Sequence, residues 1–482
     1  MAHTFHGTLR PCPDNPRYFT DDTGKAIYLS GSHTWATFSD MVPLWGEPKK
    51  EQLFDFDRWL DFSEAHGFNF LRMWSRSCGF GPTFDGKGMM QYYPSLYLEA
   101  NPERGPGETP KYDLNKLNPA YFARLRDRVI RAGERGIYVS VMLFEAWITN
   151  PYRGTPFDGH PYNKNNNING IDGDPETPPV PEELNPDGDR TMFKNCDTIT
   201  VHTLADPAIL ALQKAYVKKV VETLNDLDNV LFEICNEALR RSKYWQYEMI
   251  NYIHELERDM SKQHPVWMTH LVQAQNPALF ASPAEVVSPG VESVGEDYCV
   301  DPPILDGRKV IIADTDHLGG IWGTSQWVWK SFMRGHNPIF MDNYCMPDER
   351  THTDQTGGEG VVSQLFGRWQ YALPDNWREP VRTAMAQTLA FAKEMDMNRT
   401  FPSRTISSSR YCLANAGREY LIYQPEAGQF QVDLTGARGP FAVNWFNPNT
   451  GETIPGVSFS GGKPIDFTPP YLGEIVLHLK KV

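Results

Sequence analysis

The sequence predicts an α/β protein made of a (β/α)8 TIM barrel followed by a smaller C-terminal all-β sandwich. Up to residue 398, short apolar runs alternate with longer amphipathic segments, which is typical of a parallel sheet covered by helices. Eight such runs occur, the number of strands in a closed barrel. From residue 402 to residue 482 no helical pattern remains, and short alternating runs with Gly and Asn-Pro turns predict a sandwich. We therefore expect a barrel over residues 1–398 and a sandwich over 402–482.

The elements of the barrel follow one another in regular order. The predicted strands are 25–35, 68–75, 137–147, 229–238, 265–271, 284–289, 309–317 and 337–344. The predicted helices are 48–67, 118–136, 206–226, 243–264 and 379–396, the first of which ends at a glycine suited to a helix C-terminus. An open doubly wound sheet is the alternative, but no G-x-G-x-x-G turn follows the first strand.

A long insertion, residues 148–204, interrupts the barrel after the third strand. It contains "NKNNNINGIDGDPETPPVPEELNPDGDR", whose Asn, Gly, Asp and Pro content predicts a loop. In a barrel this loop follows the carboxyl end of a strand, where active sites lie. We therefore expect it to form part of the rim of a substrate cleft.

Composition narrows the classes of protein to consider. A net charge of −14 argues against a nucleic-acid binder. The sequence contains no run of about 18 apolar residues, so no membrane span is predicted. The first residues lack the apolar core of a signal peptide. The seven cysteines are scattered and form no C-x-x-C pair. These features suggest a cytoplasmic protein with reduced thiols, or a secreted one whose signal peptide was trimmed.

Polar and aromatic side chains collect at the carboxyl ends of the predicted strands. They are His33, Trp35, Arg72, Trp74, Glu145, Trp147, Asn236, Glu237, His270, Asp314, Asp316 and His317, and Trp322 follows closely. Polar groups at many strand ends are costly to desolvate unless they are paired, so their presence suggests a site. The four tryptophans can serve as stacking platforms for sugar rings or as core and rim packing.

Glycoside cleavage fits this set of side chains. It needs two carboxyl groups that flank the scissile bond, one as acid and one as nucleophile or base. Glu237 could face the glycosidic oxygen while Asn236 binds a ring hydroxyl. Arg72 could keep a carboxylate after the seventh strand ionised, because a nearby cation lowers its pKa.

Several motifs resemble known glycosidases. "NVLFEICNEA" resembles the strand-four signature of glycoside hydrolase clan A, in which the Glu is the acid/base, and "NFLRMW" adds an arginine two strands earlier. "RYFTDDTGKAIYLSGSHTW" resembles the start of apiosidase-like barrels, and the tail resembles the β-sandwich, labelled collagen-binding, that often follows them. The resemblance implies a retaining glycosidase that acts on an oligosaccharide or glycoside and needs no cofactor.

One position departs from the clan A pattern. After strand seven the chain has "KVIIADTDHLGG", with Asp where the family has Glu. A carboxyl separation of about 5–5.5 Å implies retention and about 6.5–9.5 Å implies inversion. Asp314 and Asp316 share one strand parity, and Asp314, nearer the core of the strand, is the preferred nucleophile.

Two other functions use the same residues. A metal-dependent hydrolase would bind a divalent cation through Asp314, Asp316 and His317, with His33 and His270 as further ligands. A catalytically inactive carbohydrate-binding protein is the other alternative. Pentofuranosides, glucosides and galactosides are all compatible substrates.

Overall fold

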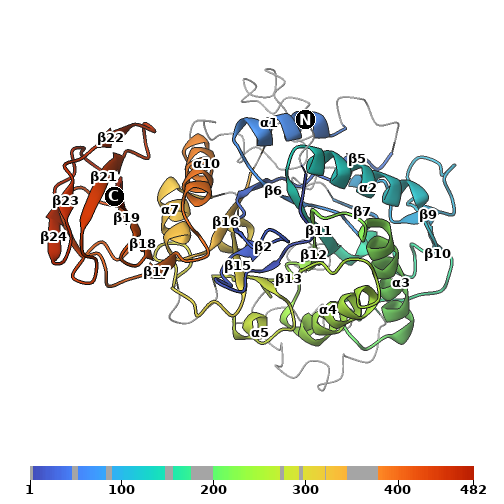
Figure 1. Cartoon of the computed structure of the whole chain (residues 1–482). Helices are drawn as coiled ribbons and strands as arrows, with labels where there is room; N and C mark the ends of the chain where they lie inside the picture. Colours follow the sequence, from blue (N-terminus) through green and yellow to red (C-terminus); the bar gives the residue numbers. More distant parts are fainter. Residues whose placement is uncertain are drawn as a thin grey trace, which may run out of the picture.

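A computed structural model shows a parallel eight-stranded barrel, which confirms the predicted fold class (Figure 1). The structure describes residues 4–45, 53–82, 89–146, 156–174, 199–271, 276–291, 297–320, 322–342, 344 and 378–482. The barrel strands are β4 (Gly31–His33), β6 (Phe70–Met73), β11 (Tyr138–Glu145), β12 (Val230–Asn236), β13 (Val266–Thr269), β14 (Val286–Ser288), β15 (Val310–Asp314) and β16 (Asn337–Met341). From β6 onward each strand pairs with the next in parallel, and β16 pairs with β4.

The gap between β4 and β6 is bridged at one residue, Asn69. Its backbone N–H donates to the carbonyl of Ser30 at 3.2 Å, and its side-chain oxygen accepts from the Ser30 N–H at 3.0 Å. The two backbones approach so closely that a Cβ atom on Gly31 would lie 2.1 Å from the Phe70 carbonyl oxygen. Only glycine fits there, so Gly31 permits the barrel to close.

Helices pack around the barrel. They are α1 (Phe56–Ala65), α2 (Pro119–Glu134), α3 (Pro207–Leu224), α4 (Lys243–Glu257), α5 (Pro277–Phe280), α7 (Ser325–Met333) and α10 (Glu379–Glu394), and two 3₁₀ turns, η4 (Pro156–Gly159) and η6 (Arg240–Ser242), accompany them. The side chains of Asp55, Asn118, Asp206 and Thr324 accept backbone N–H bonds and start α1, α2, α3 and α7. None of the described helices is both long and apolar enough to reach across a membrane.

Two predicted strands differ from the observed ones. The predicted strand 25–35 divides into β3 (Ala26–Ile27), which forms an antiparallel sheet with β1 (Arg10–Pro11) and β2 (Phe19–Thr20), and the barrel strand β4. The predicted strand 309–317 ends at Asp314, because the Asp314 carboxylate accepts the Asp316 N–H and starts the helical turn α6 (Thr315–Leu318). The strand parity expected for residues 314 and 316 therefore does not hold.

Two small sheets contain segments for which the sequence predicted no element, one strand before α1 and the others between β6 and α2. One contains β5 (Asp40–Pro43), β8 (Met89–Tyr93) and β7 (Phe80–Pro82), and the other contains β9 (Tyr97–Glu99) and β10 (Tyr112–Leu117). The described part of the 148–204 insertion packs on β10, where the Tyr112 N–H donates to the Asn166 carbonyl at 2.8 Å. This described part of the insertion therefore lies against the segment that follows β6.

The interior of the barrel changes from apolar to charged along its strands. An apolar layer fills the amino-terminal end, and it includes Leu9, Phe19, Leu29, Phe70, Leu231, Trp267, Val310, Ile312 and Ile339. Side chains that face one side of a strand recur every second residue. The next inward positions after Phe70, Leu231 and Ile312 are therefore Arg72, Glu233 and Asp314. All three are fully buried, so charge begins one layer above the apolar layer.

The C-terminal region is a sandwich of antiparallel sheets. The large sheet contains β17 (Phe401–Ser403), β18 (Cys412–Asn415), β19 (Glu419–Gln424), β25 (Ile475–Lys481), β21 (Pro440–Phe446), β22 (Thr453–Pro455) and β23 (Phe459–Ser460). The small sheet contains β20 (Phe430–Asp433) and β24 (Pro464–Phe467). Residues from both sheets, such as Val432, Phe467 and Leu477, share one hydrophobic core.

The sandwich packs on the barrel through α7 and α10, which lie between them (Figure 1). Trp329 of α7 is fully buried there and stacks on Tyr423 of the sandwich, with ring centroids 5.8 Å apart. Phe391 of α10 and Phe446 of β21 complete the contact. The two regions therefore share a continuous apolar core.

Truncation of Trp329 to alanine is expected to destabilise the protein by about 3–5 kcal/mol, because it leaves a large cavity at this junction. Chemical denaturation followed by circular dichroism measures the change. Trp322→Ala is the matched control, because Trp322 is 53% exposed and its loss should change stability by less than about 0.5 kcal/mol. Equal losses in the two variants would contradict a shared core.

Candidate active site

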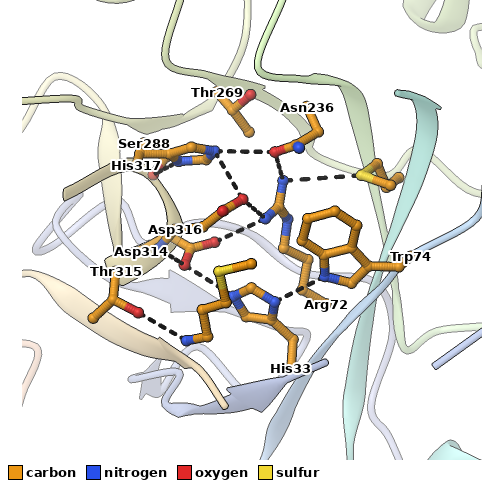
Figure 2. A network of polar contacts seen from close by, with 12 residues as sticks. His33, Arg72, Trp74, Asn236, Thr269, Ser288, Asp314, Thr315, Asp316 and His317 are labelled. Atoms are coloured by element: carbon orange, nitrogen blue, oxygen red, sulfur yellow. Dashed lines mark hydrogen bonds and ion pairs between the residues drawn. The ribbon is translucent and has the colours of Figure 1, made fainter. Parts of the chain in front are cut away.

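The charged centre of the barrel is organised around Arg72 of β6 (Figure 2). Its Nε and Nη2 donate to the two carboxylate oxygens of Glu233 at 2.8 and 2.6 Å. Its Nη1 donates to Asp314 at 3.2 Å and to Asp316 at 2.7 Å. Nη2 also donates to Asn236 Oδ1 at 2.6 Å. A guanidinium has five N–H groups, so these five hydrogen bonds give each N–H an oxygen acceptor.

Three carboxylates share this one guanidinium, and their pKa values differ. Burial raises the pKa of Glu233 despite the charge of Arg72. Burial also raises the pKa of Asp316; Arg72 opposes this shift, and the adjacent Asp314 adds to it. Burial acts in the same direction on Asp314, but contacts with His33 and Arg72 outweigh it and hold its pKa below the ordinary value. Asp314 is therefore the most firmly ionised of the three.

The proton of His33 is fixed by its two neighbours. The Trp74 Nε1–H donates to His33 Nδ1 at 2.8 Å, and an indole N–H can only donate. The single ring proton therefore lies on Nε2 and is donated to Asp314 Oδ1, 2.9 Å away. His33 is thus a neutral, fixed donor to Asp314. Trp74 is 2% exposed, so it supports this bond from within the core.

Asn236 connects Arg72 to the neighbouring strand. Since its Oδ1 accepts from Arg72, its Nδ2 is the donor to Glu145 Oε1 at 3.2 Å. Glu145 also accepts from Arg76 Nη1 at 3.1 Å. Asn236 was expected to bind a ring hydroxyl, and its amide is instead engaged on both sides by protein groups.

His317 lies on the other side of Asn236. The 3.3 Å contact between His317 Nε2 and Asn236 Oδ1 requires a proton on Nε2, so His317 Nδ1 accepts from the Ser288 hydroxyl at 2.8 Å. Burial lowers the pKa of His317 well below its ordinary value, although Asp314 acts in the opposite direction. His317 is therefore neutral.

Glu237 follows directly after β12 and differs from its buried neighbours. It is half-buried and has a φ of +44°. A non-glycine residue in the left-handed region is uncommon and is enriched at functional sites. This conformation occurs where β12 ends and the chain turns towards η6. Glu237 thus occupies the carboxyl end of the barrel next to Asn236.

The remaining predicted residues lie in different surroundings. Trp35 is 6% exposed and packs against Trp74, with ring centroids 6.4 Å apart. His270 is buried, which lowers its pKa to about 4, and its ring centroid lies 6.1 Å from that of His317. Trp322, 53% exposed, follows α6 at the surface. Trp147 lies outside the described residues.

Glu233 and Arg76 are the charged members of this network that the sequence reasoning missed. Glu233 lies inside the quoted motif "NVLFEICNEA" and shares the inward parity of Leu231. A charged side chain in a strand buried on both faces requires a partner, which is the signal that could have identified it. Arg76 lies just beyond the end of β6, where no periodic pattern assigned its direction.

Asp314, Asp316 and His317 could in principle hold a metal ion, since their ligand atoms lie within 4.8 Å of one another. However, Arg72 Nη1 donates to both aspartates, so a cation already lies between them. The Nε2 of His317 carries a proton and has no lone pair to give. A metal would have to displace Arg72, so this set of donors does not fit one.

Comparison with known proteins gives two family matches, each over less than half of the chain. Residues 85–285 match a domain of unknown function (DUF6298). Residues 403–476 match a family described as "Putative collagen-binding domain of a collagenase". No curated protein has a significantly similar sequence.

Solved structures share the architecture at low sequence identity. A glycoside hydrolase family 5 protein from Bacteroides vulgatus ATCC 8482 aligns over 99% of this chain and 93% of its own, with 12% identity and a TM-score of 0.59. A "putative glycoside hydrolase" from the same organism has 12% identity and a TM-score of 0.62 over 99% of this chain and 83% of its own. A further glycoside hydrolase gives 12% identity and a TM-score of 0.55 over 99% of this chain and 97% of its own. The chain therefore has the fold of these glycoside hydrolases, with a C-terminal domain that matches the collagen-binding family model.

Proposed function

We propose that this protein is a glycoside hydrolase that cleaves O-glycosidic bonds with retention of configuration. Glu237 is the acid/base, and an aspartate at the end of β15 is the nucleophile. One observation carries the proposal: Arg72 binds both aspartates of this region and also Asn236, the residue adjacent to Glu237. Arg72 therefore connects the end of β12, which Glu237 follows directly, to the two aspartates at and just after the end of β15.

The reaction has two steps. In the first, the aspartate attacks the anomeric carbon while Glu237 donates its proton to the departing oxygen. In the second, Glu237 takes a proton from water, which attacks the anomeric carbon and releases the aspartate. Arg72 favours the ionised form of the attacking carboxyl group, because a nearby cation lowers its pKa. Trp322, which is 53% exposed after α6, is the candidate sugar-stacking residue, because aromatic rings can pack on sugar rings.

A panel of aryl glycosides with pentose and hexose sugars tests the proposal. Turnover of one sugar whose first-formed product keeps the anomeric configuration, observed by proton NMR, is the expected result. A first product of inverted configuration would contradict the covalent mechanism. Binding of a glycan without turnover of any glycoside would instead indicate a carbohydrate-binding protein.

The metal-dependent alternative rests on the Asp314, Asp316 and His317 cluster. Because Arg72 occupies the space between the aspartates, dialysis against a chelator is expected to leave turnover unchanged. Metal analysis of the purified protein should give less than one equivalent of any divalent ion per chain. Loss of activity on chelation, with recovery on addition of Zn²⁺ or Mn²⁺, would favour the alternative.

A further inference from the structure

The two aspartates of the β15 region differ in how much of each carboxylate remains available. Asp314 Oδ1 accepts from His33 Nε2 and from the Asp316 backbone N–H, both at 2.9 Å. Its Oδ2 accepts from Arg72 at 3.2 Å. The side chain has no exposed surface. Asp314 is thus used to start α6 and to connect β4, β6 and β15.

Asp316 occupies the first turn of α6 and has a freer carboxylate. Its Oδ2 accepts from Arg72 Nη1 at 2.7 Å and lies 3.6 Å from His317 Nε2. Within the described part of the chain, its Oδ1 makes no hydrogen bond, and 4% of the side chain is exposed. Figure 2 shows Asp316 between Arg72 and His317, whereas Asp314 lies on the side of His33.

On the basis of the glycosidase function proposed above, we propose that Asp316 is the nucleophile and that Asp314 is a positioning residue. Asp316 Oδ1 forms a bond to the anomeric carbon as the bond from that carbon to the glycosidic oxygen breaks. The leaving oxygen receives the proton of Glu237. Water then hydrolyses the glycosyl ester, returns a proton to Glu237 and restores the Asp316 carboxylate.

This assignment also accounts for the shorter side chain. Aspartate lacks one methylene group relative to the glutamate of clan A. In a helical turn, two residues advance the chain by about 3 Å, which exceeds the length of one methylene. A nucleophile at position 316 therefore starts from a point further along the chain than the strand end, and Asp314 is left to fix the turn and Arg72.

Covalent labelling distinguishes the two aspartates. The probe is a 2,4-dinitrophenyl 2-deoxy-2-fluoro-glycoside of the sugar that the wild-type enzyme cleaves fastest, and fragment mass spectrometry identifies the modified residue. The expected result is one sugar on Asp316. A label on Asp314 would overturn the assignment while leaving the glycosidase function intact. Absence of turnover on every aryl glycoside would instead refute the function itself.

Matched variants give a second readout. Asp316→Ala is expected to lose at least about 10³-fold in kcat/KM, and azide should yield a glycosyl azide of inverted configuration. Asp314→Asn should lose about 10–100-fold, as supporting residues commonly do. It should still be labelled at Asp316, more slowly than wild type. Azide rescue of Asp314→Ala together with none in a folded Asp316→Ala would reverse the two roles.

Discussion

Glu237→Gln is expected to slow the cleavage of glycosides with poor leaving groups by about 10²–10⁴-fold, the usual contribution of a positioned general acid. An alkyl alcohol leaves only if it is protonated, and glutamine has no proton to give. A dinitrophenolate leaves without a proton, so the first step with that substrate should be nearly unaffected. Pre-steady-state kinetics should show a burst of dinitrophenolate followed by slow turnover.

Glu222→Gln is the control for this prediction. Glu222 lies on α3, one of the helices that pack around the barrel, with 43% of its side chain exposed. Its variant should match wild type on every substrate. If Glu237→Gln lost the same factor with good and poor leaving groups, its role as proton donor would be contradicted.

Arg72→Met is expected to destabilise the fold by about 3–5 kcal/mol, because removal of one partner leaves buried charges without compensation. Glu233 and Asp314 are fully buried, and Asp316 is nearly so. Arg72→Lys keeps the charge, but lysine has only three N–H donors and lacks the planar group that binds a carboxylate in bidentate fashion. It should therefore recover part of the stability and little of the activity. Guanidinium denaturation and kcat/KM measure the two effects.

Arg126→Met is the matched control for Arg72. Arg126 pairs with Asp226 at the surface, with side chains 39% and 60% exposed, and such pairs contribute about 0–1 kcal/mol. Similar denaturation midpoints for Arg72→Met and wild type would show that the three carboxylates do not depend on this guanidinium.

Most of the barrel could be predicted from the sequence because its strands are apolar on both faces and alternate with amphipathic helices. The end of β15 could not be predicted from the sequence. "ADTDH" continues an apolar strand without a proline or glycine, and only the Asp314 side chain, by capping Asp316, turns the chain into α6. Strand periodicity alone therefore placed Asp314 and Asp316 on the same face of the strand.

The site was predictable as a set of residues and less so as a set of contacts. In the structure, the strand ends bring Arg72, Asn236, Asp314 and His317 into one network. Which atoms pair depends on distances between strands far apart in sequence. Asn236 illustrates this. The sequence pattern is the same whether its amide faces a substrate or is bound by Arg72 and Glu145.

Azide rescue of Glu237→Ala on a dinitrophenyl glycoside of the preferred sugar tests the role of Glu237 as acid/base most directly. Without the acid/base, the glycosyl-enzyme still forms from this substrate, but water attacks it slowly. Azide can attack it without a general base. We expect azide to accelerate turnover and to give a glycosyl azide of retained configuration. Turnover of Glu237→Ala equal to wild type, or an azide product of inverted configuration, would contradict the assignment of Glu237.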